Sequence, residues 1–214
     1  MTINRETFYQ RRGKRLFDLS AAVAIGIMTL PVQAGVAALV ARKLGRPVLF
    51  RQQRPGRDGK PFYLVKFRTM TNALGPDGTL LPNDQRITDF GVKLRSSSLD
   101  ELPEILNVIR GEMSLVGPRP LLMDYLDRYT ADEARRHHAL PGITGLAQVS
   151  GRNDLDWSDK FALDIQYVDS ISFRLDLGIL LRTIASVVGR RGIGHGGEHL
   201  VSEFKGSGSY SQAR

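Results

Sequence analysis

The sequence contains no cysteine. This absence excludes disulfide bonds and metal sites built on thiolates, and it is typical of a protein that works in a reducing compartment. The chain has 214 residues, of which 42% are apolar and 24% charged, so it is long enough to bury a core without cross-links. The composition therefore predicts a folded protein with one substantial domain.

Acidic residues are scarce in the N-terminal third. Residues 1–68 hold 14 lysines and arginines against three acids, a charge of +11, whereas residues 69–214 hold 16 basic and 19 acidic residues, a charge of −3. A basic segment attracts polyanions, so three classes of partner follow: nucleic acid, an anionic membrane surface and phosphorylated substrates. The charge alone does not choose among them.

Charge is absent between Leu19 and Val40. About 20 apolar residues are enough to cross a bilayer. Basic residues flank the run on both sides, which places both ends in the cytoplasm. Pro31 in the middle predicts a break, because proline removes a helical hydrogen bond. We therefore expect a re-entrant helix-break-helix hairpin, in which Thr29 bonds a carbonyl that Pro31 frees.

Three other readings of this apolar run differ in topology or processing. A kinked transmembrane helix would cross the bilayer once, and a buried helix would belong to a soluble core. A cleaved signal peptide is not expected. Such a peptide needs a short apolar core followed by a small-residue cleavage site and a secreted domain, whereas Ala41 here leads directly into Arg42 and Lys43.

Two strand-like segments follow, at residues 47–53 and 62–68, and the turn-forming residues between them predict a β-hairpin. Lys66 and Arg68 share one face of the second strand, where they form either a phosphate clamp or a solvated surface. Apolar spacing and turn residues predict the remaining elements. These are helices over 101–109, 121–138, 158–168 and 177–188, a loop over 71–90, a short strand over 146–149, and an irregular tail from 192.

The pair Asp100-Glu101 precedes Pro103 and an apolar run. A helix that begins at Asp100 places Pro103 in its first turn, where the missing N–H costs little. Asp100 then serves as a helix cap, and this structural role alone is one reading. The other is chemical, because a carboxylate at a helix N-terminus stays ionised and can act as a nucleophile or metal ligand. Arg119 lies between two prolines that hold its backbone extended, ready to bind phosphate.

The motifs together resemble a known family, the monotopic phosphoglycosyl transferases, which are bacterial sugar transferases. The resemblance covers nearly the whole chain from Lys14. In lacking a large N-terminal multi-helix region, the sequence resembles the minimal members of the family, including those that handle N,N'-diacetylbacillosamine. The motifs that carry it are Lys14-Arg15-Leu16-Phe17-Asp18, the Pro31 hairpin, Arg54-Pro55-Gly56, Lys66-Phe67-Arg68-Thr69-Met70, Ser98-Leu99-Asp100-Glu101-Leu102-Pro103, Val116-Gly117-Pro118-Arg119-Pro120, Pro141-Gly142-Ile143-Thr144-Gly145 and Gly151-Arg152-Asn153.

The resemblance implies a fold and a reaction. The fold is α/β of the α+β kind and mostly helical, with a re-entrant membrane segment in residues 1–45, a catalytic domain with a small β-hairpin and interfacial amphipathic helices in 46–191, and a tail in 192–214. The reaction transfers a sugar 1-phosphate from a UDP-sugar, such as UDP-N,N'-diacetylbacillosamine, to undecaprenyl phosphate, and UMP is released. The enzyme would act with Mg²⁺ at the cytoplasmic face of the bacterial inner membrane, in contact with membrane lipid, and nucleic acid is not expected as a partner.

The resemblance also assigns residues to roles. Asp100 would attack the donor phosphate, form an aspartyl-phosphosugar intermediate and contact the metal, while Glu101 would assist. Phosphate or donor contacts are expected from Lys66, Arg68, Arg95, Arg119, Arg152 and Asp164. The alternative of another class is a non-catalytic, basic, membrane-anchored module that binds anionic lipid.

Overall fold

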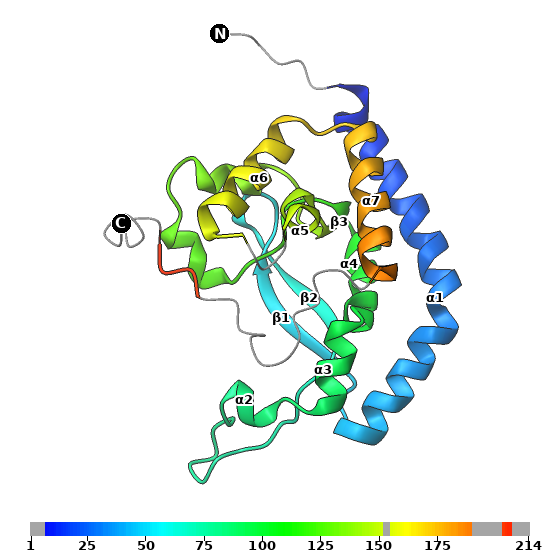
Figure 1. Cartoon of the computed structure of the whole chain (residues 1–214), viewed down its shortest axis with the longest axis vertical. Helices are drawn as coiled ribbons and strands as arrows, with labels where there is room; N and C mark the ends of the chain where they lie inside the picture. Colours follow the sequence, from blue (N-terminus) through cyan, green and yellow to red (C-terminus); the bar gives the residue numbers. More distant parts are fainter. Residues whose placement is uncertain (1–6, 152–154, 190–202, 207–214) are drawn as a thin grey trace.

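The computed structural model describes residues 7–151, 155–189 and 203–206. A single long helix, α1 (Lys14–Leu44), runs along one side of the molecule, and the rest of the described chain packs against it (Figure 1). A π-helical turn (Tyr9–Gly13) precedes it. The fold is mostly helical with a small antiparallel sheet, as the sequence predicted.

The break predicted at Pro31 is wrong, because α1 is helical on both sides of the proline and through it. Proline removes only the hydrogen bond to the carbonyl four residues earlier, that of Ile27. Thr29 does not replace this bond, since its hydroxyl donates to the Ile25 carbonyl at 2.7 Å. Figure 1 shows α1 curving instead around the domain.

Both ends of α1 pack on the same domain. Near its start, Ala22 belongs to the main core, and near its end Val36 and Val40 pack with Phe67 and Leu94. This contact holds the second half of the helix in line after Pro31. Between these ends α1 exposes large apolar side chains, at Ile27, Met28, Leu30 and Val32. Among the described residues, α1 with its preceding turn is the one helix long and apolar enough to cross a bilayer.

The predicted hairpin is confirmed, with β1 (Leu49–Pro55) antiparallel to β2 (Pro61–Phe67). A second pair was missed: β3 (Ser114–Val116) lies parallel to β4 (Gly142–Thr144). Beyond β3 the two backbones touch, and a Cβ on Gly142 would lie 2.1 Å from the Gly117 nitrogen. Only glycine permits this approach, which explains why both motifs contain one. The strand expected over 146–149 is instead a helical turn, α5 (Leu146–Ser150).

Some of the predicted helices are confirmed and others are wrong. The two C-terminal helices are confirmed as α6 (Trp157–Asp169) and α7 (Phe173–Val188). The helix expected over 101–109 is a 3₁₀ segment, η3 (Leu99–Glu104), that continues into α4 (Ile105–Arg110). The helix expected over 121–138 is wrong, because two 3₁₀ segments occupy this region, η4 (Met123–Arg128) and η5 (Glu133–His138). Three short elements were not predicted: η2 (Arg57–Gly59), α2 (Asn83–Arg86) and α3 (Asp89–Ser96).

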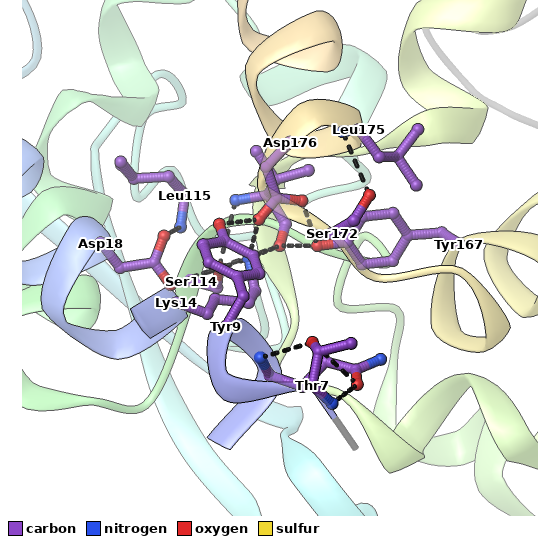
Figure 2. Close-up of polar contacts among 12 residues, drawn as sticks. Thr7, Tyr9, Lys14, Asp18, Ser114, Leu115, Tyr167, Ser172, Leu175 and Asp176 are labelled. Carbon is purple, nitrogen blue, oxygen red and sulfur yellow. Dashed lines mark hydrogen bonds and ion pairs between the residues drawn. The ribbon is translucent and has the colours of Figure 1, made fainter. Parts of the chain in front are cut away.

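A buried polar network ties the start of α1 to α6, α7 and β3 (Figure 2). Its hub is Asp176, which is fully buried and accepts hydrogen bonds from Tyr9 (2.6 Å), Lys14 (2.7 Å) and Tyr167 (2.8 Å). Lys14 and Tyr167 also donate to the carbonyl of Val116. The network therefore holds the end of β3, three residues before Arg119.

Asp18 extends this attachment one turn along α1. Its carboxylate accepts from the Ser114 hydroxyl at 2.7 Å and from the Leu115 N–H at 3.2 Å. Asp18 is 1% exposed, so these bonds replace the water it would otherwise bind. The motif Lys14–Asp18 thus fastens the apolar helix to the domain.

Candidate active site

Four separate elements bring charged side chains together. Strand β2 contributes Lys66, η3 contributes Asp100 and Glu101, α3 contributes Arg95, and the segment after β3 contributes Arg119. The charges interact closely, since Lys66, Arg95 and Arg119 all act on the pKa of Asp100. The site lies where the helix η3 packs against the hairpin, a contact between segments more than 30 residues apart in the chain.

Asp100 is 7% exposed, and its carboxylate makes no hydrogen bond to any residue in the described part of the chain. Burial, and next the charge of Glu101, raise its pKa to about 6, although Lys66, Arg95 and Arg119 act in the opposite direction. Such a carboxylate is still mostly ionised at pH 7, but it is more basic than an exposed aspartate. An ionised, unbonded carboxylate surrounded by cations is available to attack a phosphorus atom.

Glu101 differs from Asp100 because its carboxylate already accepts hydrogen bonds from neighbouring cations. One oxygen, Oε1, accepts from Lys66 Nζ at 2.7 Å and from Arg119 Nη2 at 2.8 Å. Burial opposes ionisation, yet Arg119 and Lys66 outweigh it and lower the pKa of Glu101 to about 2. Glu101 therefore orients both cations and is a poor candidate for the nucleophile.

Glu104 completes the cluster and was missed by the sequence reasoning. It is 2% exposed, and its Oε1 lies 2.9 Å from Lys66 Nζ. Burial raises its pKa to about 7. The available signal was its spacing from Glu101, because residues three apart share a face in a 3₁₀ helix, and both carboxylates contact Lys66.

The helix-cap prediction for Asp100 is wrong. The 3₁₀ segment begins at Leu99, and the residue before it, Ser98, is left-handed with φ 57° and makes no side-chain cap. Asp100 is then the second residue of a short 3₁₀ turn, where the helix dipole is small. Its environment is set by burial rather than by a helix end.

The backbone of Arg119 is held in place by a hydrogen bond from Arg136. The buried Arg136 donates to the Arg119 carbonyl at 2.7 Å and to Asp164 Oδ2 at 2.6 Å. Asp164 and Arg136 are 4% and 3% exposed, so this pair is internal. The structure corrects the expectation that Asp164 contacts the donor: it positions Arg136, which positions Arg119.

Two other predicted contacts have different outcomes. Arg68 is buried and donates to the carbonyls of Leu44 and Gly45, which end α1. It is therefore a link between helix and strand, and the phosphate clamp expected from Lys66 with Arg68 is wrong. Arg152 lies outside the described residues.

Arg95 reaches the site from α3. Its Nε donates to the Thr69 hydroxyl at 2.9 Å, which fixes the guanidinium beside Asp100. Arg54, on β1, also faces the site: burial, and next the charge of Arg119, lower its pKa to about 10. The sequence motif Arg54-Pro55-Gly56 singled this arginine out without assigning it a role.

The described residues hold no group of three potential metal ligands. Mg²⁺, however, is usually bound by one or two carboxylates together with substrate phosphates. Asp100 and the free oxygen of Glu101 fit that partial donor set. The arrangement can therefore hold a phosphorylated substrate by its cations and offer one carboxylate to it, which is the pattern of phosphoryl transfer.

Comparison with known proteins identifies the family of the chain. The family model described as bacterial sugar transferase matches residues 9–190. An uncharacterized sugar transferase, EpsL of Bacillus subtilis, is 51% identical over 198 residues, which cover 92% of this chain and 98% of that protein.

Two further relatives are named for their reactions. The undecaprenyl-phosphate galactose phosphotransferase of Salmonella typhimurium is 40% identical over 84% of this chain and 41% of its own length. The UDP-glucose:undecaprenyl-phosphate glucose-1-phosphate transferase of Caulobacter vibrioides is 41% identical over 82% of this chain and 69% of its own length. The family match over residues 9–190 covers helix α1 and the charged site alike, and the chain belongs to the bacterial sugar transferase family.

Proposed function

We propose that this chain transfers a sugar 1-phosphate from a UDP-sugar to undecaprenyl phosphate and releases UMP. One observation carries the proposal: Asp100 is buried, unbonded among the described residues and faced by Lys66, Arg95 and Arg119. A structural carboxylate in that position would be expected to bond one of these cations, as Glu101 does.

The reaction proceeds in two displacements. An Asp100 oxygen attacks the sugar-linked phosphorus, and the bond from that phosphorus to the bridging oxygen breaks, so that UMP leaves with the electron pair. A phosphate oxygen of the polyprenyl acceptor then attacks the same phosphorus and releases Asp100. Lys66 and Arg119 balance the charge of the phosphoryl group, and Glu101 keeps them oriented.

Mg²⁺ is proposed as the cofactor, with Asp100 and Glu101 as the protein's contribution to its site. When bound, the ion neutralises charge on the donor diphosphate. A chelator should remove UMP release, and Mg²⁺ should restore it.

The acceptor is a lipid, which makes the position of α1 part of the function. We propose that the exposed middle of α1 enters the bilayer while both ends stay on the cytoplasmic face. The packing of Ala22 and of Val36 on one domain supports this arrangement over a crossing helix, because a crossing helix would separate its two ends. Single cysteines at Thr7 and Arg46 should label from the same side; labelling from opposite sides would contradict the proposal.

The donor sugar is a finer question. The sequence resemblance favours an N-acetylated donor such as UDP-N,N'-diacetylbacillosamine, whereas two relatives are named for galactose and glucose. UMP release measured over a panel of these UDP-sugars, with undecaprenyl phosphate present, identifies the donor.

The central test is Asp100→Asn. This variant should release no UMP, whereas exchange of the exposed Asp127 for Asn should leave UMP release unchanged. Wild-type protein should also form a covalent phosphosugar adduct when the acceptor is omitted, detectable by intact mass. Full activity in Asp100→Asn would refute the nucleophile assignment. A non-catalytic lipid-binding module would instead release no UMP from any donor, and its binding would not depend on Asp100.

A further inference from the structure

Helix α7 exposes a stripe of apolar side chains. Phe173, Leu177, Leu181 and Ile184 are 41–60% exposed and share one face by their spacing. The stripe continues onto α1, because the Phe173 ring packs edge-on against Phe17 at 5.4 Å. Figure 1 shows the two helices side by side over this stretch. The apolar stripe of α7 therefore begins beside the first turns of α1.

A groove of about 370 Å³ lies along the neighbouring face of α7. Arg174 and Arg182 are its basic walls, two helical turns apart, with Gly178 between them. A side chain at Gly178 would meet nothing within 4 Å, so the groove is open at its centre. Leu175 and Ile179 form its apolar side.

No residue in the described part of the chain neutralises the two arginines. Neither forms an ion pair within the described part of the chain, because the nearest acids in sequence are engaged elsewhere. Asp169 pairs with Arg135 at 2.5 Å, and Asp176 pairs with Lys14 at 2.7 Å. Among the residues that the structure describes, the groove thus presents two uncompensated positive charges next to an exposed apolar stripe.

A hydroxyl donor adds to these charges. Ser172 also lines the groove, and its Oγ accepts from the Leu175 N–H at 3.3 Å, which leaves the hydroxyl proton available to an anion. Two guanidinium groups and one hydroxyl are suited to phosphate oxygens.

We propose that this groove binds the phosphate headgroup of an anionic membrane phospholipid, distinct from the polyprenyl acceptor. The apolar stripe would enter the acyl region, and the arginines would reach the phosphate level beside it. A lipid fits this juxtaposition because it carries both the phosphate and the chains that the stripe requires. The inference rests on the membrane-bound arrangement proposed above and adds a specific lipid site to it.

The absence of cysteine permits a clean test. Ser170 lines the groove and is exposed, so Ser170→Cys supplies a single attachment point for benzophenone maleimide. The labelled full chain is placed in nanodiscs of phosphatidylcholine with a minor fraction of phosphatidylglycerol and irradiated. Intact mass then counts the adducts of each lipid. Because each arginine near an anionic surface favours binding by roughly fivefold, phosphatidylglycerol adducts should exceed the bulk ratio at least roughly fivefold.

The matched variants decide the origin of any enrichment. Arg174→Gln with Arg182→Gln should return the adducts to the bulk ratio, whereas Arg51→Gln with Arg57→Gln, which removes equal charge from the exposed hairpin, should preserve the enrichment. Adducts at the bulk ratio in the unmodified groove, or enrichment that survives Arg174→Gln with Arg182→Gln, would overturn the proposal. Failure of the chain to enter discs would instead refute the membrane arrangement, and UMP release plays no part in the readout.

Discussion

Replacing Asp100 by Asn should stabilise the protein while it removes activity. The pKa of Asp100 rises from 3.8 to about 6 in the folded state, chiefly through burial. A raised pKa means that ionised Asp100 has a higher free energy in the folded state than in the unfolded state. This lowers the free energy of unfolding, and the loss is fully present above pH 6. Each pKa unit corresponds to about 1.4 kcal/mol, so ionised Asp100 costs about 3 kcal/mol at pH 8.

The assay is thermal or chemical unfolding of both proteins in detergent over a range of pH. Asp100→Asn should be more stable than wild type by up to about 3 kcal/mol at pH 8. The gap should shrink as the pH falls through 6 and vanish below about 4, where Asp100 is protonated in both states. Asp127→Asn, at an exposed position, should change little at any pH.

The opposite sign would refute the reasoning. If Asp100→Asn were less stable than wild type at pH 8, Asp100 would have to make a favourable contact, as a helix cap does. The measurement therefore separates the structural from the chemical interpretation of the same residue, and it does so without a substrate.

Four further predictions follow from the same contacts. UMP release should fall about tenfold per pH unit below pH 6, because only ionised Asp100 attacks, and a flat profile down to pH 5 would contradict this. Gly142→Ala should unfold the protein or lower its melting temperature sharply, because the new Cβ would lie 2.1 Å from a backbone nitrogen; a melting temperature equal to wild type would be inconsistent with the packing of β3 on β4. Phe204→Ala should cost about 3–5 kcal/mol in urea unfolding, since Phe204 is fully buried among four aromatic rings. Asp176→Asn should cost about 3–5 kcal/mol in the same assay, because Lys14 loses its buried partner, and an unchanged midpoint would exclude that role for the network.

Local patterns were enough to predict several elements. An uncharged and apolar stretch of about 20 residues predicts a helix that either enters a membrane or lies buried in a core. Alternating residues around a turn predicted the hairpin, and the apolar spacing of residues 177–188 predicted α7. In each case the information lies within one segment, so no knowledge of the neighbours was needed. The motifs also identified the family, because they preserve chemistry at fixed spacing.

Pro31 shows where local reasoning stops. The proline removes one hydrogen bond, at a cost on the order of 3 kcal/mol, and the sequence alone suggested a break. The packing of Val36 and Val40 on Phe67 and Leu94 keeps the helix continuous. That contact joins residues far apart in the chain, so it cannot be predicted from the sequence of residues 19–40 alone.

The charged residues divide in the same way. The sequence by itself predicted that Asp100, Glu101 and Arg119 act in one site. Only the tertiary structure decided which carboxylate is free, because Lys66 from strand β2 binds Glu101, while Asp100 has no hydrogen-bond partner among the described residues. It likewise assigned Arg68 to the end of α1 and Asp164 to Arg136. A side chain's type is written in the sequence, but its partner depends on which segments the fold packs together.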